Sequence, residues 1–208
     1  MSLALFSLPR SQQRQWLERR LSRTVLPAAK RMGDGFRLPG REGRATPAAV
    51  LIPVVNRIDG LTLLLTERSA NLPDHPGQIS FPGGRAEPGD VSLADTALRE
   101  AREEVGLLAE QVAILGELAP YETVTGYLVT PFVGWVEPPL ALKLDPLEVA
   151  DVFEVPLAFL LDPVNHRRNF RMVGELRVDY WAIPYGERDI WGATAAMLRL
   201  FIHKLCDS

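Results

Sequence analysis

The segment from Leu93 to Val105 constrains the fold most, because both its ends and its faces are marked in the sequence. Ser92 precedes it as a helix N-cap with Asp95 three residues later, and Gly106 follows as a terminator. Its apolar residues recur at a spacing of four: Leu93, Ala97, Ala101 and Val105. The segment therefore predicts an amphipathic helix that packs one face against a core.

One edge of this helix is acidic. At about 100° per residue, Glu103 and Glu104 follow Glu100 by three and four positions, so all three carboxylates share one face. Arg99 and Arg102 are expected mainly on the other side. Three like charges beside a core repel one another unless a cation neutralises them, which favours a magnesium or manganese site. The alternative is a solvated helix with ion pairs such as Arg99 to Glu103.

Composition excludes several classes of protein. A chain of 208 residues with 47% hydrophobic and 24% charged residues predicts one compact domain with terminal additions. No apolar run approaches the roughly 20 residues of a membrane-spanning helix. The net charge of −3 indicates neither nucleic acid nor an anionic membrane as a partner. Cys206 is the single cysteine, which rules out an internal disulfide and fits a cytoplasmic location.

The order of expected elements divides the chain into three parts. Residues 1–31 are basic and predict an amphipathic helix from the spacing of Trp16, Leu17, Leu21 and Val25. Residues 32–46 are rich in Gly, Arg and Pro and predict a linker, and residues 47–208 form the main domain. In that domain we expect a hairpin of strands over 48–55 and 61–66, a loop over 67–90, strands over 112–118, 129–136, 152–155, 170–173 and 180–183, and a closing helix over 190–205. Strands bracketed by helices predict a layered α/β or α+β fold.

A glycine-containing bend lies just upstream of the acidic helix. Phe81 and Pro82 precede Gly83 and Gly84, whose missing side chains let backbone amides or carbonyls approach a ligand. Taken alone, the same four residues would equally form a simple tight turn.

Together these features resemble the Nudix box, G-x5-E-x7-R-E-U-x-E-E-x-G-U with U aliphatic, which runs here from Gly84 to Leu107. Its second half matches with Ala101 as the aliphatic residue. Asp90 replaces the first glutamate, and one extra residue separates it from Arg99. The resemblance implies an α/β/α sandwich with a mixed sheet.

The longer spacing resembles the coenzyme A pyrophosphatase branch of that family. The upstream element of this branch, L-L-T-x-R-[SA]-x3-R-x3-G-x3-F-P-G-G, matches Leu64 to Gly84 except that Pro73 replaces the second arginine. The resemblance implies cleavage of coenzyme A or acyl-CoA into 4′-phosphopantetheine, or its acyl form, and adenosine 3′,5′-bisphosphate. A homodimer is left open.

The resemblance also implies a set of catalytic residues. Glu100, Glu103 and Glu104 would hold Mg²⁺ or Mn²⁺, with a carbonyl near Gly84 as a further ligand, and hard oxygen ligands suit these ions. The ion would orient the diphosphate and activate a water. Arg99 would orient a glutamate.

The remaining candidates are a general base and substrate contacts. Glu100 and Glu148 are the candidates for the base, although Glu148 could equally be a surface acid. Arg68 is a candidate phosphate clamp or a surface ion pair. His75, Gly83 and Gly84 are expected to line the substrate site, and His75 has a purely structural role as its alternative.

Other functions stay open at this point. A Nudix hydrolase for ADP-ribose, a dinucleotide or a nucleoside triphosphate is the nearest alternative, supported by Pro73. A non-catalytic nucleotide-binding module would not need all three glutamates, and a protein-interaction module would bind without magnesium.

Overall fold

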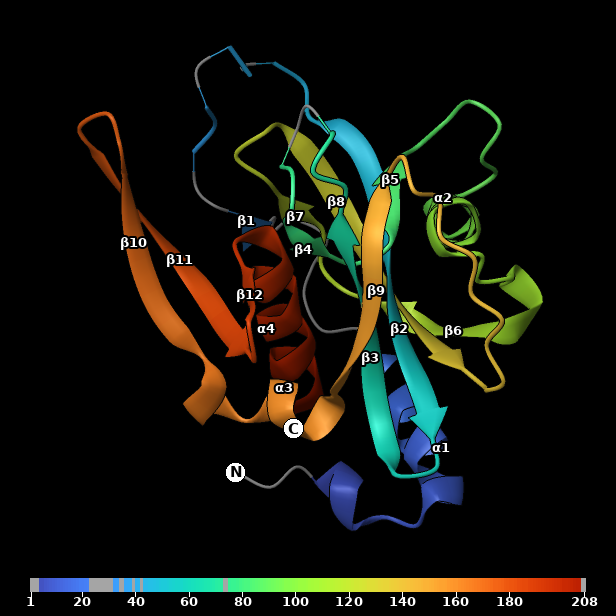
Figure 1. The fold of residues 1–208 in the computed structure, drawn as a ribbon. Helices are drawn as coiled ribbons and strands as arrows, with labels where there is room; N and C mark the ends of the chain where they lie inside the picture. Colours follow the sequence, from blue (N-terminus) through green and yellow to red (C-terminus); the bar gives the residue numbers. More distant parts are fainter. Residues whose placement is uncertain are drawn as a thin grey trace.

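The computed structural model describes residues 4–22, 32–33, 36–38, 40–41, 43–72 and 75–206. Its centre is a nine-stranded mixed sheet (Figure 1). The strands are β1 (Met32–Gly33), β2 (Thr46–Arg57), β3 (Gly60–Arg68), β4 (Ile79–Ser80), β5 (Gly83–Arg85), β6 (Val112–Glu117), β7 (Tyr121–Glu122), β8 (Tyr127–Val136) and β9 (Val149–Pro156). The main path through the sheet is β1-β7-β8-β2-β3-β4. β2 runs parallel to β8 and antiparallel to β3 and β5, while β9 pairs with β3.

Helices cover both faces of this sheet (Figure 1). They are α1 (Arg10–Leu21), α2 (Leu93–Val105), α3 (Leu157–Leu161) and α4 (Ala193–Cys206), with 3-10 turns η1 (Ala4–Ser7), η2 (Ala109–Gln111) and η3 (Pro163–Asn165). Side chains along a strand alternate between faces, so β2 contributes to two cores. Ala49 and Leu51 join α2 in one core, whereas Ile52 and Val54 join α1, α3 and α4 in the other. The predicted α/β/α fold with a mixed sheet is confirmed.

A second, three-stranded sheet consists of β10 (Arg167–Val173), β11 (Leu176–Tyr185) and β12 (Arg188–Trp191). Its β10–β11 hairpin projects from the body on the side away from α2 (Figure 1). No helix among the described residues is long and apolar enough to cross a bilayer.

Several sequence predictions differ from the structure in their boundaries. The helix over 93–105 and the hairpin of β2 and β3 are confirmed. The predicted loop over 67–90 contains two short strands, β4 and β5, and the predicted linker contains β1. The closing helix begins later than expected, because Ile190 pairs with Ile183 in a strand. Val25 and Pro73 lie outside the described residues.

Candidate active site

The bend at Gly83 and Gly84 joins the sheet to helix α2. β5 pairs with β2, which places Gly84 opposite Ala49. A Cβ at Gly83 would lie 2.4 Å from the Ala49 carbonyl oxygen, so only glycine allows this approach. The Gly83 amide donates a 3.1 Å hydrogen bond to Oε2 of Glu104. The bend thereby presents its backbone to the acidic helix.

Gly84 lies against the carboxylate of Glu100. A Cβ at Gly84 would be 2.4 Å from Glu100 Oε1 and 2.6 Å from its Cδ, closer than atoms can pack. The Glu100 side chain is 14% exposed. The glycine therefore makes the space that this mostly buried carboxylate fills.

Arg99 connects the acidic groups instead of pointing away from them. Its guanidinium donates to Glu100 Oε1 at 3.0 Å, to Glu103 Oε2 at 2.9 Å and to the Arg85 carbonyl at 3.0 Å. The expected segregation of arginines from glutamates is therefore wrong at this position. The ion pair between Arg99 and Glu103, which belongs to the solvated-helix alternative, is present, and it does not exclude a role for Arg99 in orienting Glu100.

Asp90, the residue that departs from the Nudix pattern, holds Arg99 in place. Its Oδ1 accepts from Arg99 Nε at 2.9 Å, and its Oδ2 accepts from the Thr96 hydroxyl and the Glu87 amide at 2.8 Å each. The hydrogen bond from Arg99 holds the pKa of Asp90 well below its usual range. Although one extra residue separates Asp90 from Arg99, the two side chains still form an ion pair.

Burial and neighbouring charges give Glu104 an unusual carboxyl group. Glu104 is 3% exposed. Its pKa is raised to about 8, mainly by burial and also by the carboxylates of Glu100 and Glu148, while the Gly83 hydrogen bond acts in the opposite direction. Burial also raises the pKa of Glu100, with contributions from Glu103 and Glu148. Glu100, Glu104 and Glu148 therefore repel one another across a partly water-excluded space.

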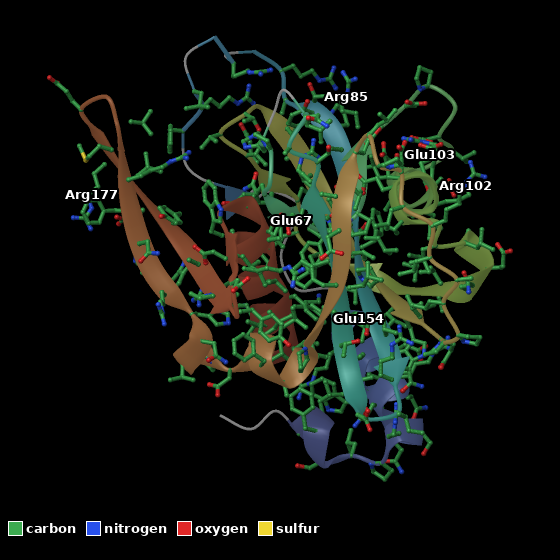
Figure 2. The ribbon with its side chains drawn as sticks, viewed as in Figure 1. Glu67, Arg85, Arg102, Glu103, Glu154 and Arg177 are labelled. Carbon is green, nitrogen blue, oxygen red and sulfur yellow. The ribbon has the colours of Figure 1, made fainter. Side chains whose placement is uncertain are left out.

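Glu103 differs from the other two helix glutamates. Its side chain is 50% exposed and lies toward Arg99 and Arg102, on the outward side of α2 (Figure 2). Within the described part of the chain, no group of three or more His, Cys, Asp or Glu side chains is already arranged to hold a metal ion. The three carboxylates share a helix face, yet their tips diverge because Glu104 turns into the core and Glu103 pairs with arginine.

Glu148 approaches the site from the connection between β8 and β9. It is exposed, and its backbone carbonyl accepts from the Ser69 amide at 2.8 Å, which ties it to the end of β3. Its electrostatic effect on Glu100 and Glu104 shows that the loop acid lies near the helix acids.

Arg68 and His75 occupy the segment that leads to the bend. The charge of Arg68 lowers the pKa of Glu104, so this cation also lies near the site. Arg68 Nε is buried and has no hydrogen-bond partner among the described residues. His75 has a φ of 56° in the turn before β4, and its carbonyl accepts from the Gln78 amide at 3.2 Å.

The residues fit a divalent cation by their chemistry. Magnesium and manganese prefer carboxylate oxygens, and the mutual repulsion of Glu100, Glu104 and Glu148 is the kind of charge that such an ion offsets. Gly84 leaves room beside Glu100 where any side chain would collide.

Comparison with known proteins places this site in a family. A model of the NUDIX domain matches residues 45–173, more than half of the chain. A Nudix hydrolase NudL of Photorhabdus laumondii is 45% identical over 175 residues, covering 83% of this chain and 87% of the relative. A NudL of Citrobacter koseri is 46% identical over 154 residues, covering 73% and 79%. Among solved structures, a MutT protein of Methanosarcina mazei Go1 is 26% identical with a TM-score of 0.46, covering 58% of this chain and 83% of that one.

Members of this family are pyrophosphatases that act on diphosphate derivatives of nucleotides and typically use a divalent metal ion. The matched range includes the glycine bend, the acidic helix and the loop acid. The chain therefore belongs to the Nudix hydrolase family.

Proposed function

We propose that this chain hydrolyses the diphosphate of coenzyme A or acyl-CoA, giving 4′-phosphopantetheine, or its acyl form, and adenosine 3′,5′-bisphosphate. The observation that carries the reaction class is the glycine bend, which hydrogen-bonds Glu104 and makes room for Glu100. The choice of coenzyme A rests on the upstream element from Leu64 to Gly84, which resembles that branch of the family.

Each candidate residue has a distinct task in this proposal. Glu100 and Glu104, with Glu103 beside them, would hold Mg²⁺ or Mn²⁺, and this ion would supply charge neutralisation at the diphosphate and a more acidic water. Arg99 orients Glu100 through the hydrogen bond between them. The guanidinium of Arg68 would bind a phosphate oxygen, as arginine does in other phosphate sites, and its Nε has no hydrogen-bond partner within the part of the chain that the structure describes.

Glu148 is the better of the two candidate bases. Glu100 is held by Arg99 and packed against Gly84, whereas Glu148 is exposed and can contact a water directly. Glu148 would take one proton from the water as the water oxygen bonds to phosphorus. The bond from this phosphorus to the bridging oxygen breaks, and that oxygen leaves with the other phosphate. One diphosphate and one water thus give two phosphate monoesters.

Turnover of a substrate panel tests this assignment. Coenzyme A, ADP-ribose and a nucleoside triphosphate are incubated with the full chain, with and without Mg²⁺, and products are identified by mass spectrometry. We expect the two coenzyme A fragments to form only with Mg²⁺. Glu103→Gln removes a charge beside the ion with little change of shape, so it should reduce the rate at least about 10-fold.

Glu110→Gln is the matched control, because Glu110 is exposed on η2 just beyond the acidic helix. This variant should retain the wild-type rate. Faster turnover of ADP-ribose or the triphosphate than of coenzyme A would overturn the substrate assignment. Full activity of Glu103→Gln would remove Glu103 from the site.

A further inference from the structure

The connection between β8 and β9 is fastened to the end of helix α2 at two points. The Lys143 amide donates to the Val105 carbonyl at 2.9 Å, and the Asp145 amide donates to the Glu104 carbonyl at 3.0 Å. Gly106 has a φ of 72°, and a Cβ there would lie 2.8 Å from the Lys143 nitrogen. The loop therefore packs directly on the backbone of the residue that carries the buried carboxyl group.

Asp145 then organises the turn that follows. Its Oδ1 accepts from the Leu147 amide at 2.9 Å. Its carbonyl accepts from the Glu148 amide at 3.1 Å and from the Val149 amide at 2.8 Å. Pro146 has no amide hydrogen, so Leu147 is the first residue after Asp145 that can donate to its side chain. The turn reverses the chain so that Glu148 meets the end of β3.

A third bond closes the arrangement on the other side. The Ser69 amide, just after β3, donates to the Glu148 carbonyl at 2.8 Å, and Ser69 is 4% exposed. The backbone around Glu148 is therefore hydrogen-bonded on one side to the helix that carries Glu104 and on the other to the end of the strand that carries Arg68. Because the Glu148 side chain is exposed, these backbone hydrogen bonds are what fix its position.

We propose that Asp145 is a positioning residue whose side-chain turn and backbone contact with Glu104 hold Glu148 beside the helix glutamates. This inference rests on the proposed role of Glu148 as the base. Asp145 acts through the acceptor oxygen of its side chain and not through its charge, because that oxygen contacts the Leu147 amide inside its own turn.

Two substitutions separate the oxygen from the charge. Asp145→Asn keeps an acceptor for Leu147 and loses the charge, whereas Asp145→Ala loses both. With the substrate that the full chain turns over fastest among coenzyme A, ADP-ribose and a nucleoside triphosphate, Asp145→Ala should lower kcat at least about 10-fold with KM within twofold. Asp145→Asn should stay within twofold of wild type in both.

A double-mutant cycle with Glu148→Gln tests whether Asp145 acts through Glu148. If Asp145 acts through Glu148, Asp145→Ala should cause no further loss of kcat in the Glu148→Gln background. The proposal would be overturned if the loss of kcat in the double variant equalled the product of the two single losses. Equal losses of kcat in Asp145→Ala and Asp145→Asn, or an unchanged kcat in Asp145→Ala, would also overturn it.

A matched control lies elsewhere in the chain. Asp162 also precedes a proline, and its Oδ1 accepts from the Val164 amide at 3.1 Å before η3. Asp162→Ala removes the same kind of turn bond outside the site, so it should leave kcat unchanged. A loss equal to that in Asp145→Ala would indicate a general effect on stability and would contradict a positioning role.

Amide hydrogen exchange tests the frame independently of turnover. The Leu147 and Ser69 amides should exchange at least about 10-fold faster in Asp145→Ala and at the wild-type rate in Asp145→Asn. Unchanged protection of Ser69 in the alanine variant overturns the inference even if the full chain hydrolyses nothing in the panel. A full chain that hydrolyses nothing in the panel would refute the proposed function. Failure of the proposed function and failure of the Asp145 proposal are therefore distinguishable.

Discussion

Replacing Glu104 by glutamine is expected to stabilise the metal-free protein above pH 8 and to remove most of its hydrolytic activity. Burial raises the pKa of Glu104 from 4.5 to about 8. The folded protein therefore keeps a proton that the unfolded chain releases near pH 4.5. Stability from this group is complete below pH 4.5 and is lost as the pH rises through 8. The loss is on the order of 5 kcal/mol, because each pKa unit corresponds to about 1.4 kcal/mol.

Glutamine has the shape of the protonated acid and no charge, so Glu104→Gln should show a much flatter dependence of stability on pH. Urea unfolding of the metal-free variant and wild type at pH 5, 7 and 9 measures this difference. Because the proposed cation needs the same carboxylate, kcat should fall at least about 100-fold. Glu110→Gln should change neither property. An equally steep loss of stability with pH, or a wild-type kcat, in Glu104→Gln would contradict this assignment.

The second large effect is expected from Gly84→Ala. The added Cβ would lie 2.4 Å from Glu100 Oε1, so the carboxylate must leave its place. Gly84 is not among the glycines with positive φ, so alanine fits the backbone and the loss arises at Glu100. We expect kcat to fall at least about 10-fold, with the free energy of unfolding changed by less than about 1 kcal/mol.

Gly89→Ala is the control in the same loop, because a Cβ there meets nothing within 4 Å and Gly89 also lacks a positive φ. It should keep the wild-type kcat and gain up to about 1 kcal/mol of stability from lower entropy of the unfolded chain. Steady-state kinetics and urea unfolding on the two variants separate the effects. Equal kcat in Gly84→Ala and wild type would show that Glu100 is not needed where the structure places it.

The helix α2 could be predicted to the residue because its signals are local. Ser92 accepts from the Asp95 amide, and Gly106 has the left-handed conformation that ends a helix. The predicted start of the closing helix at Ile190 is wrong, because apolar residues from Ile190 onward fit a helix and a strand equally well. Ile190 lies in a strand because it pairs with β11, and this pairing depends on tertiary contacts.

The candidate site was only partly predictable for the same reason. Helical periodicity correctly brought Glu100, Glu103 and Glu104 to one face, but it could not show that Glu104 is buried or that Arg99 turns back to pair with Glu103. The contact of Asp145 with Glu104 joins residues far apart in the chain. Its only local signal was an aspartate before a proline, which is typical of a turn. The roles of these residues stay predictions.

In the proposed function, Glu100 and Glu104, beside the Gly84 bend, hold the divalent ion at which a diphosphate is cut. Anomalous diffraction from crystals of the full chain grown with Mn²⁺ and a non-hydrolysable diphosphate analogue tests it most directly. We expect a manganese peak bonded to oxygens of both glutamates at about 2.2 Å, absent in Glu104→Gln. A manganese ion bound elsewhere, or none near these carboxylates with the analogue in place, would contradict it.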